Sequence, residues 1–172
     1  MDQLVFIDEA GIDTAESRHY GWALKGETPV IEKPSGGRRL NMLGAISGDG
    51  RTALRRHHGP VNGSTFLEFL RTDLAPTLRK GDVLIMDRAS IHRVKSVEAF
   101  LSEIGVTVML LPAYSPELNP IELSWAWIKK LVRDQPARAL DALDRLVCDL
   151  WGRLNVQLCS SWVRHAGYRQ ST

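Results

Sequence analysis

The chain has 172 residues, which is enough for one domain with a substantial buried core. Its 44% hydrophobic and 24% charged residues are average for a globular protein and exclude disorder and low complexity. The net charge of +2 excludes a strongly basic nucleic-acid module but not a nuclease, because acidic residues that hold metal ions can cancel basic patches elsewhere in the total.

Hydropathy and cysteine usage restrict the setting of the protein. Outside proline, no apolar run exceeds four residues, so the sequence predicts no membrane span, and no targeting segment precedes the first apolar stretch. Cys148 and Cys159 are too few for a disulfide framework and do not have metal-ligand spacing. We therefore expect a reduced, cytoplasmic setting and no membrane partner.

Short apolar runs predict three central strands. Leu4–Ile7 stops at Asp8 and Val83–Met86 stops at Asp87, and both runs are typical of parallel strands that are buried on two faces. A third run, from Val106 to Leu111, predicts another strand.

Between the first two runs, the sequence predicts a long insertion and then a hairpin. Residues 10–38 are rich in glycine, proline and charge, with one short strand candidate at His19–Leu24, and insertions of this length are usually functional or mobile. Two strand-like segments, Leu40–Ser47 and Arg51–His58, surround a Gly48-Asp49-Gly50 turn. This pattern is typical of an antiparallel hairpin.

Four further segments carry apolar stripes at helical spacing. They are Ser64–Thr77, Val94–Ile104, Pro120–Val132 and Arg138–Leu154. In the first of them, Thr65 and Glu68 form a candidate capping box. The order of the elements predicts a mixed α/β layer, with the antiparallel hairpin on one side of a parallel core.

Two aspartates that follow central strands are candidate catalytic residues. Asp8 and Asp87 stand in near-duplicate contexts, directly after the runs LVFI and VLIM. Parallel neighbours end at one edge of a sheet about 4.8 Å apart, and ligands bind at that edge in open α/β sheets. Two carboxylates so close repel each other unless a cation lies between them, and a hard divalent ion with oxygen ligands resolves the conflict.

Glu122 is the third candidate, because the chain after the third strand returns to the same edge. Prolines at 112, 116 and 120 keep the connection extended, Asn119 is a good N-cap, and Pro120 is a good first helical residue. Glu122 then projects from the first turn of a helix near the two aspartates. Alternatively, Glu122 is the glutamate of a capping box and each aspartate is a solvated strand end. The convergence of all three acids favours a divalent-metal site.

Four motifs carry a resemblance to a known family. They are Phe6-Ile-Asp8-Glu9, the segment from Tyr20-Gly-Trp22 to Lys25-Gly26, Met86-Asp87-Arg-Ala-Ser-Ile-His92, and Leu111-Pro-Ala-Tyr-Ser-Pro-Glu-Leu-Asn-Pro-Ile-Glu122 followed by Trp125. With these motifs, and with 34 residues between Asp87 and Glu122, the chain resembles the catalytic domain of the DDE transposases. The resemblance is specifically to the mariner-like superfamily and its bacterial insertion-sequence relatives, and it covers about residues 3–133.

This resemblance implies a ribonuclease H-like α/β fold, with a mixed five-stranded sheet, an antiparallel hairpin and flanking helices. It implies a single DDE catalytic domain over residues 1–172. Within that domain we expect a core at about 3–133, an insertion at about 10–38 and C-terminal helices at about 138–168.

The implied activity is metal-dependent DNA cleavage followed by transfer of a 3′-hydroxyl to target DNA, with Asp8, Asp87 and Glu122 as the catalytic triad. In-line displacement at phosphorus suits two Mg2+ or Mn2+ ions, and we expect Asp8 to bridge them while Asp87 and Glu122 each bind one. The expected partners are transposon-end and target DNA, and a second copy of the chain in a homodimer. The alternative is a catalytically idle DNA-binding or dimerisation partner of a full-length transposase.

The start of the chain departs from the pattern of this superfamily. Its members usually carry N-terminal helix-turn-helix modules, whereas this chain begins at the first catalytic strand. We therefore expect the second half of a split or frameshifted element, served by a separate helix-turn-helix chain, or else a remnant or an isolated catalytic domain.

Several other residues have alternative roles. His92 either orients a water or a phosphate or makes a hydrogen bond at a helix start, and Glu9 points away from Asp8 by strand alternation. Trp22 is a candidate dimer contact, as that region is in relatives. The basic clusters that either hold DNA phosphates or form a solvated face are Arg38-Arg39, Arg51, Arg55-Arg56-His57-His58 and Lys129-Lys130.

Overall fold

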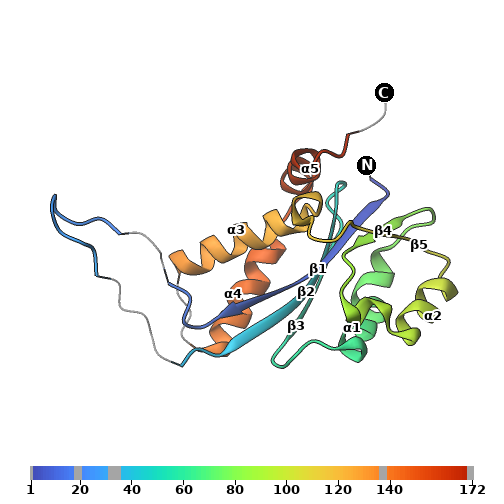
Figure 1. The fold of residues 1–172 in the computed structure, drawn as a ribbon, viewed down its shortest axis with the longest axis horizontal. Helices are drawn as coiled ribbons and strands as arrows, with labels where there is room; N and C mark the ends of the chain where they lie inside the picture. The colour runs from blue at the N-terminus through green and yellow to red at the C-terminus, as the bar shows by residue number, and fades with distance from the viewer. Residues whose placement is uncertain (1, 18–20, 31–35, 136–138, 170–172) are drawn as a thin grey trace.

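The computed structural model describes residues 2–17, 21–30, 36–135 and 139–169. Its centre is one five-stranded sheet with the order β3-β2-β1-β4-β5 (Figure 1). The strands are β1 (Leu4–Asp13), β2 (Arg39–Ser47), β3 (Thr52–His57), β4 (Val83–Met86) and β5 (Thr107–Leu110). Strands β1, β4 and β5 run parallel, whereas β2 pairs antiparallel with β1 and with β3. The predicted mixed sheet with an antiparallel hairpin is confirmed.

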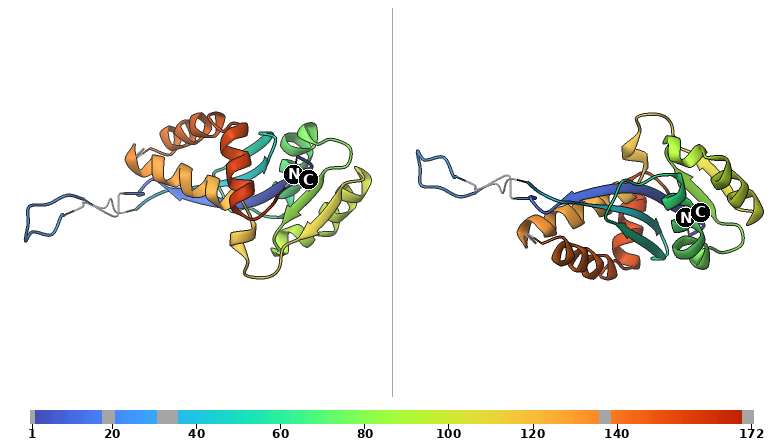
Figure 2. Two further views of the ribbon diagram at one scale, coloured as in Figure 1. Left: turned by 90° about the horizontal axis from the view of Figure 1, so that it is seen from above. Right: turned by 90° about the horizontal axis from the view of Figure 1, so that it is seen from below.

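Helices cover both faces of this sheet (Figure 2). One face carries α1 (Gly63–Phe69) and α2 (Lys95–Glu103), and the other carries α3 (Ile121–Asp134), α4 (Leu140–Gly152) and α5 (Val156–His165). Short helical turns lie at Leu70–Leu74, Ala75–Thr77, Ser90–Arg93 and Pro116–Leu118. In the described part of the chain, no helix is long and apolar enough to cross a membrane.

Side chains of β1 alternate between two hydrophobic clusters, one on each face of the sheet. Val5 and Ile7 pack in the cluster that includes α1 and α2, and Phe6 packs in the cluster that includes α3, α4 and α5. Because strand side chains alternate with a period of two, Asp8 lies on the α3 side of the sheet and Glu9 on the α1 side. Asp8 and Glu9, although consecutive in β1, therefore lie on opposite faces of the sheet.

The first strand is longer than the sequence predicts. The apolar run ends at Ile7, but β1 continues through Asp8 as far as Asp13. The reason is its pairing with β2, which continues to the pair Asp13↔Arg39 and holds residues that have little strand pattern of their own. The insertion predicted at 10–38 therefore begins only after β1 has ended.

The strand candidate at His19–Leu24 is not found. Residues 18–20 lie outside the described residues, and residues 21–24 have no regular secondary structure. Residues 21–30 are exposed throughout and project away from the sheet, as Figures 1 and 2 show, and Trp22 is fully exposed. A dimer contact at Trp22 stays a prediction.

The segment predicted as one helix at Ser64–Thr77 is a succession of three helical forms. A π-helical turn and then a 3-10 turn follow α1, and Pro76 in the last turn does not have the N–H group that a continuing α-helix needs. The predicted capping box at Thr65 is wrong. Asn62 is the N-cap instead, and its side chain accepts hydrogen bonds from the backbone N–H groups of Ser64 and Thr65.

The segment predicted at Arg138–Leu154 contains α4, and a separate helix, α5, follows it. Asn155 begins α5 as its N-cap, because its side chain accepts a hydrogen bond from the backbone N–H of Leu158. Trp151 of α4 packs against Trp125 of α3 with ring centroids 5.1 Å apart. These two buried rings hold α3 and α4 together against the sheet.

Candidate active site

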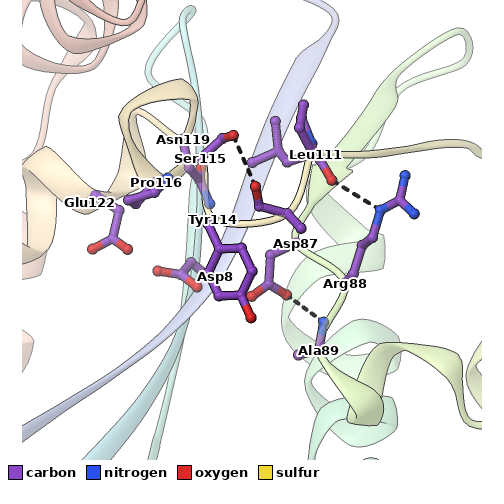
Figure 3. Close-up of a pocket in the computed structure, with 12 residues that line it drawn as sticks. Asp8, Asp87, Arg88, Ala89, Leu111, Tyr114, Ser115, Pro116, Asn119 and Glu122 are labelled. Carbon is purple, nitrogen blue, oxygen red and sulfur yellow. Dashed lines mark hydrogen bonds between the residues drawn. The ribbon is translucent and has the colours of Figure 1, made fainter.

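The three acids predicted from the sequence line one pocket. Asp8 belongs to β1, Asp87 directly follows β4, and Glu122 lies in the first turn of α3. The pocket has a volume of about 410 Å³ and is also lined by the loop at 111–116. In Figure 3 the three carboxylates point into it. The fold therefore brings together acids that are far apart in the sequence.

Strand pairing explains why the two aspartates lie side by side. The parallel pairing of β1 with β4 ends at Phe6↔Ile85. Asp8 and Asp87 each lie two residues further along, so they occupy the next position on the same face of the sheet. Because β4 itself ends at Met86, β1 has no parallel neighbour beyond this point, and the pocket lies there.

Glu122 reaches the aspartates because α3 lies close against the sheet. Gly44 of β2 pairs with Asp8, and a Cβ atom at Gly44 would lie 2.5 Å from the ring of Trp125 in α3. Trp125 is buried and lies one turn after Glu122 on the same side of the helix. A glycine at this position therefore lets the indole approach the sheet and brings the start of α3 to the pocket.

Asn119 ties the proline-rich loop to β1. Its side chain is buried, and its amide donates a hydrogen bond to the carbonyl of Ile7 at 3.2 Å. The prediction that Asn119 is the N-cap of α3 is wrong, because Pro120 occupies the N-cap position and no side chain caps the helix. The capping-box alternative for Glu122 is wrong for the same reason, and the N–H of Asn119 donates to the carbonyl of Pro116.

The acids of the pocket repel one another in partly buried surroundings. The pKa of Asp8 is raised to about 7, mainly because burial disfavours its charged form and then because of the negative charge of Glu122. The charges of Asp87 and Glu9 raise this pKa further, against an opposing hydrogen bond from the Glu9 backbone. Ionised Asp8 is therefore costly unless a cation compensates it.

The donor set fits a hard divalent ion, although it is not arranged as a finished site. All three residues are carboxylates, whose oxygens are the ligands that Mg2+ and Mn2+ prefer. In the described part of the chain, no group of three or more His, Cys, Asp or Glu side chains is arranged so that it could hold a metal ion. A divalent ion would cancel the repulsion that raises the pKa of Asp8 and so allow the acids to approach.

A second charged cluster lies directly behind Asp87. Nδ1 of His92 hydrogen-bonds with the carbonyl of Asp87 at 3.1 Å and lies 3.0 Å from its Oδ1, while Nε2 lies 3.2 Å from Oε1 of Glu9. Burial lowers the pKa of His92, but the contacts with Glu9 and Asp87 outweigh burial and raise the pKa above its usual value. Sequence reasoning left Glu9 aside, although strand alternation sends it to the face where His92 lies.

The rim of the pocket carries an exposed aromatic residue in a strained backbone conformation. Tyr114 has a φ of 57°, which is the one positive φ of a non-glycine residue within the described ranges. Its side chain is fully exposed, and it lines the same pocket as the three acids. Since this conformation costs about 1–2 kcal/mol for most L-residues, the surrounding loop must hold Tyr114 in place.

Two of the arginines that were expected either to hold DNA phosphates or to form a solvated face instead make ion pairs within the protein. Arg51 pairs with Asp82 at 2.5 Å and with Asp49 at 2.8 Å. Arg55 pairs with Asp73 at 2.6 Å. Both arginines therefore stabilise the fold, and binding to a phosphate would require these ion pairs to break.

Comparison with known families gives the class of the protein. The family of DDE superfamily endonucleases matches residues 3–144, and the chain belongs to this family. The chain is similar to the transposable element Tc3 transposase of Caenorhabditis elegans, with 23% identity over 94% of this chain and 52% of the relative. It is also similar to the Tcb2 transposase of Caenorhabditis briggsae, with 26% identity over 67% of this chain and 44% of the relative. The chain thus spans about half the length of the curated relatives it matches.

Solved structures with the same fold come from the Mos1 mariner transposase. The Mos1 paired-end complex with the left transposon end matches with a TM-score of 0.79 and 16% identity, over 96% of this chain and 52% of that chain. The Mos1 catalytic domain matches with a TM-score of 0.71 and 15% identity, over 96% of this chain and 77% of that chain. The ribonuclease H-like fold and the resemblance to mariner-like DDE transposases are confirmed.

Proposed function

We propose that this chain is a single transposase catalytic domain over residues 1–172, with Asp8, Asp87 and Glu122 as its catalytic residues. The observation that carries the proposal is the meeting of these three acids in one pocket. Membership of the DDE superfamily endonucleases supports it. The proposed reaction is divalent-metal-dependent DNA cleavage followed by strand transfer.

The chemistry of the pocket supports two Mg2+ or Mn2+ ions as cofactors. Such ions supply activation of the attacking oxygen and stabilisation of the leaving oxygen at phosphorus. Asp8 is the natural shared ligand, because after burial the charges of both Glu122 and Asp87 raise its pKa. Asp87 and Glu122 would then each hold one ion. Mos1 paired-end complexes have been solved with Mn and with Mg, which supports the choice of ions.

The proposed partners are transposon-end DNA, target DNA and a second copy of this chain. The similar Mos1 structures include a paired-end complex with a transposon end and a strand transfer complex, which supports DNA as the substrate. End recognition would come from a helix-turn-helix module, supplied by a separate chain if the element is split. The proposed place of the reaction is the cytoplasm.

A plasmid-nicking assay tests this function directly. We expect the chain to nick supercoiled plasmid in Mg2+ or Mn2+ and to lose this activity in Asp87→Asn and in EDTA. Asp141→Asn, which removes an exposed acid of α4 far from the pocket residues in sequence, is the matched control and should keep the activity. Nicking that survives Asp87→Asn would contradict the assignment of the triad.

The idle-partner function has one observation in its favour. Among the described residues, the acids are not arranged as a finished metal site. Calorimetric titration with Mn2+ distinguishes the two functions, because an active domain should bind two ions in a manner that depends on Asp8, Asp87 and Glu122. An idle partner would bind DNA or a transposase without this metal binding.

A further inference from the structure

His92 and Glu9 lie on the face of the sheet opposite to the pocket, yet His92 contacts Asp87 of the pocket. His92 belongs to the 3-10 turn at Ser90–Arg93, directly after β4, and is 5% exposed. Its ring packs on Phe66 of α1 with centroids 4.5 Å apart. Glu9 reaches the same place from β1 because it alternates with Asp8. The imidazole therefore lies between Glu9 and the strand end that carries Asp87.

The contacts of Asp87 are concentrated on one of its two carboxylate oxygens. Oδ1 accepts a hydrogen bond from the N–H of Ala89 at 2.9 Å and lies 3.0 Å from Nδ1 of His92. The same Nδ1 also hydrogen-bonds with the carbonyl of Asp87. Since both neighbours of Nδ1 are oxygen acceptors, Nδ1 carries a hydrogen and donates it. This arrangement fixes one oxygen of Asp87 and leaves Oδ2 to face the pocket.

Glu9 in turn holds the other side of the imidazole. Oε1 of Glu9 and Nε2 of His92 are both buried, and neither has a hydrogen-bond partner of good geometry elsewhere in the described residues. They face each other at 3.2 Å. A buried polar atom is costly without a partner, so this pair favours one orientation of the ring. The chain Glu9–His92–Asp87 thus runs from the α1 side of the sheet to the pocket.

We propose that His92, supported by Glu9, is a positioning residue for Asp87, which it holds with Oδ1 turned inward and Oδ2 presented to a divalent ion. The Asp87 side chain is 53% exposed and would otherwise be free to adopt other rotamers at the end of β4. Residues that orient a metal ligand in this way typically change metal affinity by about 10–100-fold when they are replaced. This inference rests on the proposed function, because it needs Asp87 to bind metal.

Two substitutions of His92 separate positioning from simple packing. His92→Phe keeps a ring against Phe66 but removes both nitrogens, whereas His92→Asn places an amide nitrogen near the position of Nδ1. The measurements are Mn2+ affinity by calorimetry and thermal unfolding without metal. We expect His92→Phe to unfold at a lower temperature than the wild type, because Oε1 of Glu9 loses its partner, and to bind Mn2+ about tenfold more weakly where it is still folded, whereas His92→Asn should keep affinity within about threefold.

Glu9→Leu provides a second test that does not alter the buried imidazole. It keeps a similar side-chain shape and removes the acceptor, and we expect Mn2+ affinity to fall about threefold or more. If His92→Phe does not fold, the Mn2+ affinity of Glu9→Leu alone tests the positioning role. Unchanged Mn2+ affinity in Glu9→Leu and His92→Phe overturns the proposal, and so does a loss in His92→Asn as large as that in His92→Phe.

Asp8→Asn separates failure of this inference from failure of the proposed function. If the wild-type chain binds no Mn2+, or if Asp8→Asn binds it as well as the wild type, the metal site itself is wrong and both proposals fall. If Mn2+ binding depends on Asp8 but is indifferent to His92 and Glu9, only the positioning role is overturned.

Discussion

Strand β4 has an aspartate next to each end, and the two lie in opposite electrostatic surroundings. Asp82, just before the strand, is 3% exposed, and its carboxylate is bound by the guanidinium of Arg51 and the backbone N–H of Arg79. Asp87, just after the strand, shares a pocket with two further acids, and its presence raises the pKa of Asp8. Charge is compensated by an arginine at one end of the strand, whereas at the other, acidic end the carboxylates repel one another.

This difference indicates that the charge of Asp82 stabilises the fold, whereas the charges around Asp87 serve to bind a ligand. A buried acid with an arginine partner is a fixed part of the fold, and removing one partner leaves an isolated charge. Acids that repel one another destabilise the fold but create a place where a cation binds strongly. Substitutions at the compensated end, around Asp82, should therefore lower the free energy of unfolding. Substitutions of the acids at the acidic end, around Asp87, should raise the free energy of unfolding and weaken cation binding.

The largest expected effect comes from breaking the compensated end. Arg51→Ala leaves Asp82 buried without its guanidinium partner, and we expect a loss of about 3–5 kcal/mol in the free energy of unfolding, measured with urea. Arg153→Ala is the matched control, because its pair with Asp149 has both side chains more than half exposed and should contribute less than about 1 kcal/mol. Equal losses in the two variants would show that the cluster around Asp82 has no special structural role.

The acidic end should respond with the opposite sign and with a dependence on pH. Asp8 has a pKa of about 7 in the folded chain against 3.8 as its usual value, so folded Asp8 keeps a proton that the unfolded chain has lost. The free energy of unfolding therefore falls as the pH rises from about 4 to about 7. Below pH 4, Asp8 is protonated in both states and does not lower the stability.

Asp8→Asn removes this penalty. Without metal, we expect the variant to be more stable than the wild type by roughly 2–4 kcal/mol at pH 8 and to match it at pH 4. Urea unfolding at the two pH values measures the difference. A variant that is less stable than the wild type at pH 8 would contradict the account of the acidic end.

An intermediate effect should follow from crowding the contact that brings α3 to the pocket. Gly44→Ala places a Cβ atom 2.5 Å from Trp125 and 2.8 Å from Trp151. Overpacking of this kind costs about 1–3 kcal/mol, and displacement of α3 should also weaken Mn2+ binding through Glu122. Gly152→Ala is the control, because nothing lies within 4 Å of its added atom. Mn2+ titration should leave the control unchanged, and urea unfolding should show no loss of stability in it.

The smallest expected effect concerns the strained rim of the acidic end. Tyr114→Gly relieves the left-handed conformation and should raise stability by up to about 1 kcal/mol, because the relief exceeds the entropy that glycine loses on folding. Ala113→Gly, one residue earlier and not among the residues of positive φ, should lower stability by about 0.5–1 kcal/mol. Thermal unfolding compares them, and a loss of stability in Tyr114→Gly would show that the strain is absent.

The sequence predicts the acidic end well because its signals are local. Apolar runs that stop at Asp8 and Asp87 predict both the central parallel strands and the edge at which they meet. Proline spacing before Glu122 indicates a loop that returns there. These predictions depend only on the pattern of buried strands and on the conformational limits of proline. They can therefore be made from short segments, without knowledge of the rest of the chain.

Features held by distant partners could not be predicted in this way. Residues after Asp8 form a strand because β2 pairs with them, not because of their own pattern. The side-chain amide of Asn119 donates a hydrogen bond to the carbonyl of Ile7, which is 112 positions away, and does not cap the helix that follows it. The contact of Glu9 with His92 likewise joins two elements across the sheet. In each case a tertiary contact overrides the local preference.

The length of β1 insulates the pocket from the projecting segment beyond it. Five ladder pairs, from Glu9↔Leu43 to Asp13↔Arg39, separate Asp8 from the point where the insertion leaves the sheet. The exposed residues 21–30 can therefore be shortened or lengthened while the geometry at Asp8 stays the same. The β1–β2 ladder therefore decouples the chemistry of the acids from the length of the projecting segment.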